Sequence, residues 1–257
     1  MQAVEFVFQE LLTLTTITMC FFREGMWTRF FPAMKQVRDL VAGGSIGRPI
    51  VVSGDFGWAT RVCDNGHRIY FPDSGGMIYD VAMYMAQLGL AVFEGDSFGR
   101  TTAMGTTIQK QSAPVDHTAL VSSQFFNSNG FLQFYVTGQA NTEERAVIQG
   151  TTGRIVLEAH HIPSGFKLYK EGGRVGSPSA SGDDAQVFSF PLPDDSYATW
   201  NNPGSIGFSY QIEAVGKALQ NGDLECPQYT WRESLEVAKM MENIRGQVIS
   251  DEASGVS

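Results

Sequence analysis

Cysteine is scarce in this chain of 257 residues, which holds three thiols, Cys20, Cys63 and Cys226. The number is odd, and no two of them form a C-x-x-C pair. The spacing therefore indicates neither a disulfide framework nor a redox-active dithiol. We expect free thiols in a reducing compartment, with the cytosol as the default location.

Glycine is abundant, yet the spacings used for nucleotide binding are missing. None of the 28 glycines has another glycine two positions away, so the G-x-G-x-x-G dinucleotide fingerprint cannot occur. The Gly216-Lys217 step lacks the earlier glycine and the following Ser or Thr of a phosphate-binding loop. The four histidines show no H-x-x-x-H spacing and join no cysteine cluster, so we expect no metal site.

Basic residues are outnumbered, because 18 Lys and Arg face 27 Asp and Glu and the net charge is −9. This balance argues against a nucleic acid or an anionic membrane as partner and favours small molecules or proteins. The longest uncharged run, Leu11 to Phe22, is shorter than the roughly 20 residues of a membrane span. Glu5 and Glu10 precede it where a signal peptide has basic residues. We treat residues 1–22 as an atypical apolar segment whose threonines, from Thr13 on, favour an extended strand.

Hydrophobic periodicity predicts an α+β protein. Pro32 begins a helix that Gly43-Gly44 ends, and two further helices close the chain, the last behind the capping box Thr230 to Glu233. A tail at 250–257 should fray. The predicted strands are 50–56, 98–108, 118–126, 131–138, 145–149, 154–158, 166–169 and 186–190. Short turns between them favour an open, mainly antiparallel sheet covered by helices on one face. The other face is left to solvent or to a partner subunit.

An unusual polar pair stands on a helix that follows the long loop 57–76. Apolar residues of this helix repeat every three or four positions, whereas Asp80, Tyr84 and Gln87 project oppositely. A phenol beside a carboxylate can move a proton to or from a substrate hydroxyl, provided that its surroundings bring the tyrosine pKa toward working pH. The alternative is that Tyr84 only packs and Asp80 is a solvated helix position.

Several motifs, taken in order along the chain, give it a family likeness. The first three are Glu24-Gly25-Met26-Trp27-Thr28-Arg29-Phe30-Phe31-Pro32-Ala33, Gly44-Ser45-Ile46-Gly47 and Asp55-Phe56-Gly57. The block from Pro72 to Tyr84 is similar to a G-G-x-L-x-D-x-x-x-Y signature, and Gly150 to Gly153 to a later hairpin. Together they resemble the glucose-fructose oxidoreductase and inositol dehydrogenase (Gfo/Idh/MocA) family, nearest to its dihydrodiol and D-xylose dehydrogenase branch. The likeness extends from about Phe22 to Val248.

The resemblance implies a C-terminal domain, spanning 23–249, that binds substrate and forms dimers through its open sheet face. It implies that Tyr84 acts as the acid/base and that Asp80 orients substrate or Tyr84. By the same likeness Trp27 and Arg29 lie near the nicotinamide, although a packing anchor and a surface charge are equally open readings. Arg68 could contact a sugar or a diol, and a solvated loop charge is the alternative. Aromatic residues before the penultimate helix could line the pocket or belong to the core: Tyr197, Trp200 and Phe208.

The chain also departs from this family. The Gly-rich phosphate loop and a Glu-Lys-Pro segment have no counterpart upstream of Phe22, and no Lys-Pro step occurs. The resemblance implies NADP or NAD as cofactor, but we expect the chain alone to bind neither and to be inactive. Three hypotheses remain: the substrate half of a sugar or dihydrodiol dehydrogenase, a non-catalytic module that pairs with a full-length homologue, or a small-ligand domain without redox chemistry.

Overall fold

A single eight-stranded sheet organises the molecule. The computed structural model describes residues 3–253 except 19, 111–112, 171–184, 195, 197–198, 201 and 203. The strands are β1 (Pro49–Gly57), β2 (Phe98–Lys110), β3 (Ala113–Phe125), β4 (Phe131–Thr137), β5 (Ala146–Gly150), β6 (Gly153–Leu157), β7 (Gly165–Lys170) and β8 (Gln186–Ser189). The predicted α+β class with an open, mainly antiparallel sheet is confirmed.

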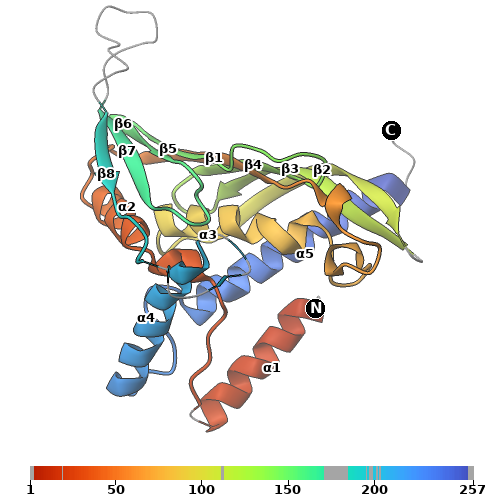
Figure 1. Cartoon of the computed structure of the whole chain (residues 1–257), viewed down its shortest axis with the longest axis horizontal. Coiled ribbons are helices and arrows are strands. Elements are labelled where there is room, and N and C mark those ends of the chain that lie inside the picture. Colours follow the sequence, from red (N-terminus) through yellow and green to blue (C-terminus); the bar gives the residue numbers. More distant parts are fainter. Residues whose placement is uncertain are drawn as a thin grey trace, which may run out of the picture.

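The strand order is β2-β3-β4-β1-β5-β6-β7-β8. The pairs β2–β3, β3–β4, β5–β6, β6–β7 and β7–β8 are antiparallel, and short turns at Asn129-Gly130 and at Thr151-Thr152 join β3 to β4 and β5 to β6. The exception is β1, which lies between β4 and β5 and runs parallel to β4. The first strand of the chain therefore occupies the middle of the sheet, and the loop that follows it lies at one end of the strands (Figure 1).

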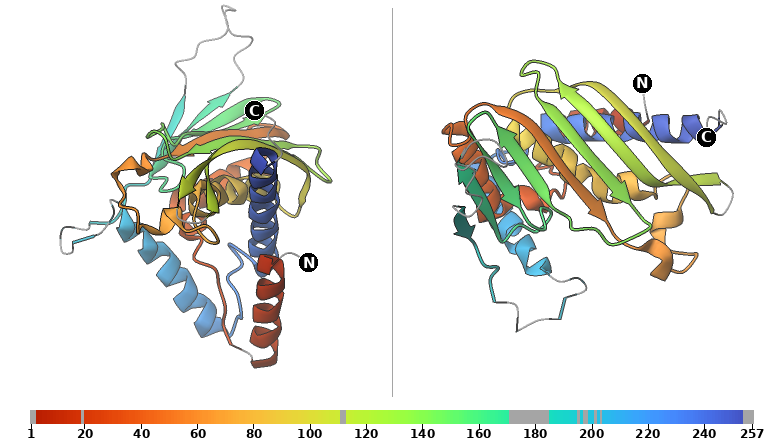
Figure 2. Two further views of the ribbon diagram at one scale, coloured as in Figure 1. Left: turned by 90° about the vertical axis from the view of Figure 1, so that its right-hand side faces the viewer. Right: turned by 90° about the horizontal axis from the view of Figure 1, so that it is seen from above.

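Helices cover one face of this sheet. The helices are α1 (Ala3–Thr18), α2 (Pro32–Ala42), α3 (Met83–Val92), α4 (Phe208–Asn221) and α5 (Trp231–Ala253). Figures 1 and 2 show α3 and α5 beneath the sheet, while α4 and α1 lie on the same side but farther from it. Each residue of α3 from Met85 to Val92 is buried, which makes it the central helix of the core. Among the described helices, none combines the length and the apolarity needed to cross a bilayer.

The extended strand expected around Thr13 is wrong, because this segment is helical in α1. Three threonine hydroxyls bond to the carbonyl four residues earlier, from Thr13 to Gln9, from Thr15 to Leu11 and from Thr18 to Leu14, at 2.9, 2.9 and 2.7 Å. Each hydroxyl thus finds its partner inside the helix. Intrinsic β preference is a weak constraint, and local hydrogen bonding overrides it here.

The predicted capping box at the start of α5 is confirmed. The Thr230 amide donates to Glu233 Oε2 at 3.0 Å, and the Glu233 amide donates to Thr230 Oγ1 at 3.3 Å. These reciprocal bonds satisfy amide groups that a helix start leaves open. At its other end α5 continues to Ala253, three residues past the point at which fraying was expected to begin.

The outer face of the sheet carries an apolar row. Met104 pairs with Leu120, which pairs with Tyr135, and these side chains are 65%, 53% and 40% exposed. They lie side by side across β2, β3 and β4, on the face that no helix covers in Figure 2. The uncovered face is therefore partly apolar rather than uniformly hydrated.

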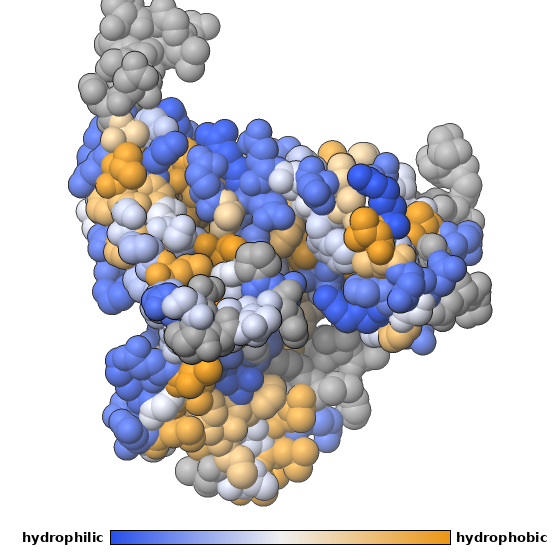
Figure 3. Space-filling view, viewed as in Figure 1, coloured by the Kyte–Doolittle hydropathy of each residue, from blue (hydrophilic) through white to orange (hydrophobic). Residues whose placement is uncertain are grey.

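The penultimate helix also presents apolar residues to solvent. Phe208, Ile212 and Leu219 of α4 are 41%, 69% and 55% exposed. The 3.6-residue period correctly predicts a helix there, but its apolar stripe is turned away from the core. In Figure 3 apolar side chains gather at the bottom of the molecule, where α4 and α1 lie.

Candidate functional site

The segment that carries Asp80 is a π-helix. Ile78–Ala82 adopts this wider turn and leads directly into α3. The wider turn is the part of the helix that carries Asp80, whereas Tyr84 stands in the α-helical part. Gln87 does not line the site with Asp80 and Tyr84, contrary to the prediction: it is buried, and its Oε1 accepts a hydrogen bond from Arg29 Nε at 2.8 Å.

Asp80 and Tyr84 both line a cavity of about 770 Å³. One side of the cavity is formed by β1, the loop after it and the π-helix, and the other by the start of α4 and the turn after β6. Its lining comprises Trp27, Phe56, Trp58, His67, Arg68, Asp80, Val81, Tyr84, Glu144, Ala159, His161, Ile162, Asn202, Ser205 and Phe208. This volume suits a small organic ligand.

Asp80 is held by two donors from the loop region after β1. Trp58 Nε1 donates to its Oδ2 at 3.0 Å, and Arg68 forms an ion pair with its Oδ1. The Asp80 side chain is 8% exposed and that of Arg68 is 67% exposed. A buried carboxylate is thus oriented by an indole, and its partner cation remains accessible from solvent.

Tyr84 is held separately by Trp27, whose Nε1 donates to the phenol oxygen at 3.0 Å. Burial raises the pKa of Tyr84, and the negative charge of Asp80 adds to this, while the Trp27 hydrogen bond acts in the opposite direction. The surroundings therefore move the pKa away from working pH, contrary to the condition attached to the acid/base hypothesis. Tyr84 is suited to donating a hydrogen bond as a neutral phenol.

A stacked aromatic pair also lines the cavity. Trp27 and Phe208 stack with ring centroids 4.3 Å apart and an interplanar angle of 19°. Trp27 is 8% exposed whereas Phe208 is 41% exposed, so the phenyl ring is the open member of the pair. An exposed ring face of this kind can pack against the C–H face of a sugar or a ring diol.

The structure does not bring Arg29 into this cavity. Its guanidinium is buried and bonds to both Gln87 oxygens, to the Gln228 carbonyl and to Glu233 Oε1, at distances from 2.8 to 3.1 Å. Burial lowers the pKa of Arg29, and Glu233 opposes that shift. The alternative reading of Arg29 as a surface charge is wrong, because the residue is 2% exposed. All three of its guanidinium nitrogens bond within the protein, and its contact with a cofactor stays a prediction.

Of the aromatic residues predicted to line the pocket near the start of α4, one does so and one does not. Phe208 lines the cavity, but Trp200 is 37% exposed and is not among the lining residues. Tyr197 lies outside the described residues.

Ten of the fifteen lining residues were not predicted, and those with aromatic or ionisable side chains are Phe56, Trp58, His67, Glu144 and His161. His161 Nδ1 lies 3.2 Å from Glu144 Oε2, and the imidazole packs on the Phe56 ring at 4.5 Å. Burial lowers the pKa of His161 to about 4, and burial raises that of Glu144. Glu144 precedes β5 and His161 follows β6, so the β5–β6 hairpin brings the two residues together. In the sequence, the signal for them was no more than ionisable residues in loops.

The cavity does not fit the phosphates of a dinucleotide. Arg68 is the single arginine among its lining residues, no lysine joins it, and its charge faces Asp80. Phosphate recognition needs a cluster of backbone N–H groups or free cations. Among the described residues, no group of three or more His, Cys, Asp or Glu side chains could hold a metal ion.

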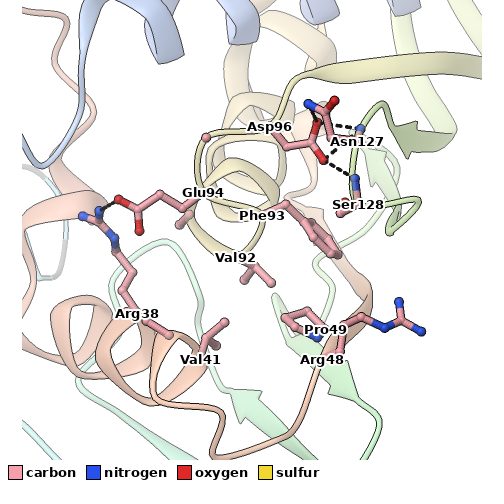
Figure 4. Close-up of a pocket in the computed structure, with 13 residues that line it drawn as sticks. Arg38, Val41, Arg48, Pro49, Val92, Phe93, Glu94, Asp96, Asn127 and Ser128 are labelled. Carbon is pink, nitrogen blue, oxygen red and sulfur yellow. Dashed lines mark hydrogen bonds and ion pairs between the residues drawn. The ribbon is translucent and has the colours of Figure 1, made fainter.

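A smaller cavity of about 460 Å³ lies between α2, the end of α3 and the β3–β4 turn. Asp96, Asn127 and Ser128 lie at one end of it and the Arg38–Glu94 ion pair at the other (Figure 4). Burial raises the pKa of Asp96, but backbone N–H groups of Ser128, Asn127 and Ser97 overcome this and lower it to about 2. Because this carboxylate is saturated with backbone donors, the larger cavity is the better candidate site.

Residues 34–156 match the family model described as the GFO/IDH/MocA C-terminal domain. This part of the chain is thus similar to the family that its motifs resemble.

Among curated proteins, the chain is 26% identical to trans-1,2-dihydrobenzene-1,2-diol dehydrogenase of Danio rerio, covering 93% of this chain and 66% of the relative. It is 24% identical to D-xylose 1-dehydrogenase (NADP(+)) of Hypocrea jecorina, covering 86% and 58%. The chain thus spans less than two thirds of the length of these relatives. An NAD binding oxidoreductase from Klebsiella pneumoniae shares the fold with a TM-score of 0.71 at 14% identity, over 96% of this chain and 70% of the other.

Proposed function

We propose that this chain supplies the substrate side of an NAD(P)-dependent dehydrogenase that oxidises a CH–OH group of a sugar or a dihydrodiol. The observation that carries the proposal is that the Asp80–Arg68 pair and the Trp27–Phe208 stack line one cavity. Polar groups together with an open aromatic ring match a ligand with hydroxyls and an apolar C–H face. The curated relatives that carry dehydrogenase names support the reaction class.

Each residue then has a role in binding. The Asp80 carboxylate accepts hydrogen bonds from substrate hydroxyls, and Arg68, which is free to turn toward solvent, donates one. Trp27 donates to the Tyr84 oxygen, so the phenol proton remains available for the substrate oxygen. Phe208 packs on the carbon skeleton. His161, neutral at pH 7 because burial lowers its pKa to about 4, completes the wall as an uncharged polar group.

The nicotinamide, when bound, supplies the hydride acceptor, but the described residues that line the cavity do not form a phosphate cradle. We propose that another domain, in the same or another polypeptide, holds the dinucleotide. The chain alone should then bind neither NADP nor NAD and show no turnover, since hydride transfer needs both partners in place. We keep the cytosol as the proposed location, because Cys20, Cys63 and Cys226 are all free.

Calorimetric titration of the purified chain tests the proposal. NADP and NAD should give no heat of binding, whereas D-xylose or a dihydrodiol should bind weakly and lose affinity in Asp80→Asn. Asp96→Asn is the matched control, because Asp96 is also a buried carboxylate but belongs to the smaller cavity. Micromolar binding of NADP together with turnover, or ligand binding that ignores Asp80→Asn, would contradict it.

We further propose that the chain forms a homodimer through the outer face of the sheet. The apolar row Met104, Leu120 and Tyr135 supports this, since exposed apolar patches mark contact sites. Leu120→Lys should convert a dimer into a monomer by light scattering, whereas Thr102→Lys on the same face is the control. A wild-type chain that is monomeric at high concentration would argue against this interface.

The apolar stripe of α4 favours one alternative function, a non-catalytic module that pairs with a full-length homologue. Ile212 and Leu219 are turned to solvent without contact to the cavity. Under this alternative, the chain should co-purify with such a homologue, and Ile212→Glu should abolish the association. A chain that stays self-contained in the presence of that homologue excludes it.

A further inference from the structure

Asp116 is a buried carboxylate that lies outside the cavity and contacts the segment carrying Asp80. It belongs to β3 and is 1% exposed. Its Oδ2 accepts a hydrogen bond from the amide of Ile78, the first residue of the π-helix, at 2.8 Å. A carboxylate at this place satisfies an amide that the helix start leaves open and complements the helix dipole. Asp116 therefore caps the helix that carries Asp80 and Tyr84.

Two glycines join this cap to the loop that carries Arg68. Gly76 has φ +94°, and a Cβ built there would lie 2.1 Å from Asp116 Oδ1. A Cβ on Gly75 would lie 2.6 Å from the carbonyl oxygens of both Arg68 and Ile69. Only glycine allows the loop, the helix start and the carboxylate to approach so closely. This contact gives the Gly-Gly pair of the sequence motif a physical reason.

Arg245 of α5 holds both parts of this junction. Its Nε lies 3.4 Å from Asp116 Oδ1, and its Nη2 donates to the Pro72 carbonyl in the loop. The guanidinium also lies over the ring of Tyr79 in the π-helix, 5.1 Å from its centroid. One side chain thus links the cap, the loop and the capped helix. It is 20% exposed, and Asp116 is fully buried.

The Arg68–Asp80 pair needs such support. Arg68 is two-thirds exposed, and an ion pair with an exposed arginine is screened and loses side-chain entropy. Its geometry is therefore set by the backbones on which the two residues stand. Those backbones are the loop that ends at Pro72 and the helix that begins at Ile78, the two segments that Arg245 and Asp116 contact.

We propose that Asp116 and Arg245 are positioning residues, which clamp the Arg68 loop onto the Asp80 helix across Gly75-Gly76 and thereby set the polar end of the cavity. The catalytic meaning of this clamp rests on the proposed function, but the clamp itself does not. Removing it should displace Asp80 relative to the loop without removing any group that lines the cavity.

The indole of Trp58 gives a direct readout, because its Nε1 donates to Asp80 Oδ2 at 3.0 Å. In an NMR spectrum of the 15N-labelled full chain, Trp58→Phe identifies this indole signal. Asp116→Asn keeps the shape and removes the charge. We expect it to shift the Trp58 signal and to make that indole proton exchange with solvent at least about tenfold faster, as expected when a local contact opens.

Asp96→Asn is the control for mere destabilisation. Asp96 is 5% exposed, and it accepts hydrogen bonds from the amides of Ser97, Asn127 and Ser128. This variant should lower the melting temperature but leave the Trp58 signal in place. If Asp116→Asn does not fold, Arg245→Gln provides the same test at the partly exposed partner.

The outcomes separate this inference from the proposed function. A Trp58 signal that is unchanged in Asp116→Asn and Arg245→Gln, or that responds equally to Asp96→Asn, overturns the clamp. A signal that moves in the clamp variants alone supports it. If the wild-type chain binds no D-xylose or dihydrodiol while the signal still moves, the proposed substrate fails and the clamp stands.

Discussion

Two arginine–carboxylate pairs occupy different regions and differ in access to solvent. In the first, Arg29 and Glu233 lie 2.8 Å apart with side-chain exposures of 0% and 12%. In the second, the exposures of Arg68 and Asp80 are 67% and 8%. The first pair has additional bonds to Gln87 and Gln228, whereas Arg68 bonds to Asp80 at the mouth of a cavity.

This difference in exposure distinguishes a pair that stabilises the fold from a pair that can bind a ligand. A cation whose donors are all used inside the protein has none left for a ligand, and removing its partner leaves a buried charge. A cation that reaches solvent over a buried carboxylate can exchange one partner for another at little cost. We infer that the Arg29 region joins the first 3₁₀ turn, Trp27–Phe30, to α3 and α5, and that the Arg68 region meets substrate.

The largest expected effect is on stability. Arg29→Ala should lower the free energy of unfolding by about 3–5 kcal/mol, because Glu233 and Gln87 lose their buried partner. Arg68→Ala, the matched control in the open pair, should cost less than about 1 kcal/mol. Urea titrations of both variants measure this difference. Equal losses would mean that the two regions are not distinct in the way proposed.

As pH falls, the stabilising contribution of His161 in the cavity should be lost before that of the Arg29–Glu233 pair. Burial and then His160 lower the pKa of His161 from 6.5 to about 4, so its stabilising contribution is complete above pH 6.5 and is lost as pH falls toward 4. Burial would raise the pKa of Glu233, but Arg29 and Thr230 lower it overall, so that pair keeps its charge to lower pH.

His161→Phe tests this order. Within that window the wild-type free energy of unfolding should fall by up to about 1.4 kcal/mol per pH unit more steeply than that of the variant. Urea titrations at pH 7, 6, 5 and 4 give the two slopes, and Glu144 is present in both proteins. His67→Phe is the control, since His67 lies on the other side of the cavity in the loop after β1. Parallel slopes would show that His161 does not titrate differently in the folded state.

Ligand affinity should depend on the Arg68–Asp80 pair and not on the Arg29–Glu233 pair. Asp80→Asn should weaken binding of D-xylose or a dihydrodiol about tenfold or more, since a charge-assisted hydrogen bond contributes about 1.5–3 kcal/mol. Glu233→Gln, which keeps the shape of the closed pair, should leave the affinity of the folded protein within about twofold. Calorimetry on both gives the comparison. A larger loss in Glu233→Gln would assign the ligand to the Arg29 region.

The smallest expected effect concerns the aromatic side of the cavity. Phe208→Ala should weaken ligand binding about three- to tenfold, in line with about 0.5–1.5 kcal/mol for an aromatic contact. Ile212→Ala, one turn further along α4 and 69% exposed, should leave affinity unchanged. The same calorimetric titration measures both. If the two variants behave alike, the stacked pair has no part in binding.

Much of the fold followed from local patterns. The short β runs, the turn residues at Asn129-Gly130 and Thr151 to Gly153 and the Thr230–Glu233 capping box predicted elements that the structure contains. The threonines of α1 misled, because their hydroxyls find carbonyl partners within a helix. The place of β1 between β4 and β5 was beyond these patterns, since strand order depends on long-range contacts.

For the site, the sequence by itself determined the family motif and the positions of Asp80 and Tyr84 on one helical segment. Only the tertiary structure decided which residues meet them. Trp58, Arg68 and Trp27 reach the pair from distant segments, Gln87 is buried against Arg29, and burial raises the pKa of Tyr84. Sequence spacing records neighbours within one element, whereas desolvation and partner choice depend on every element that packs around the site.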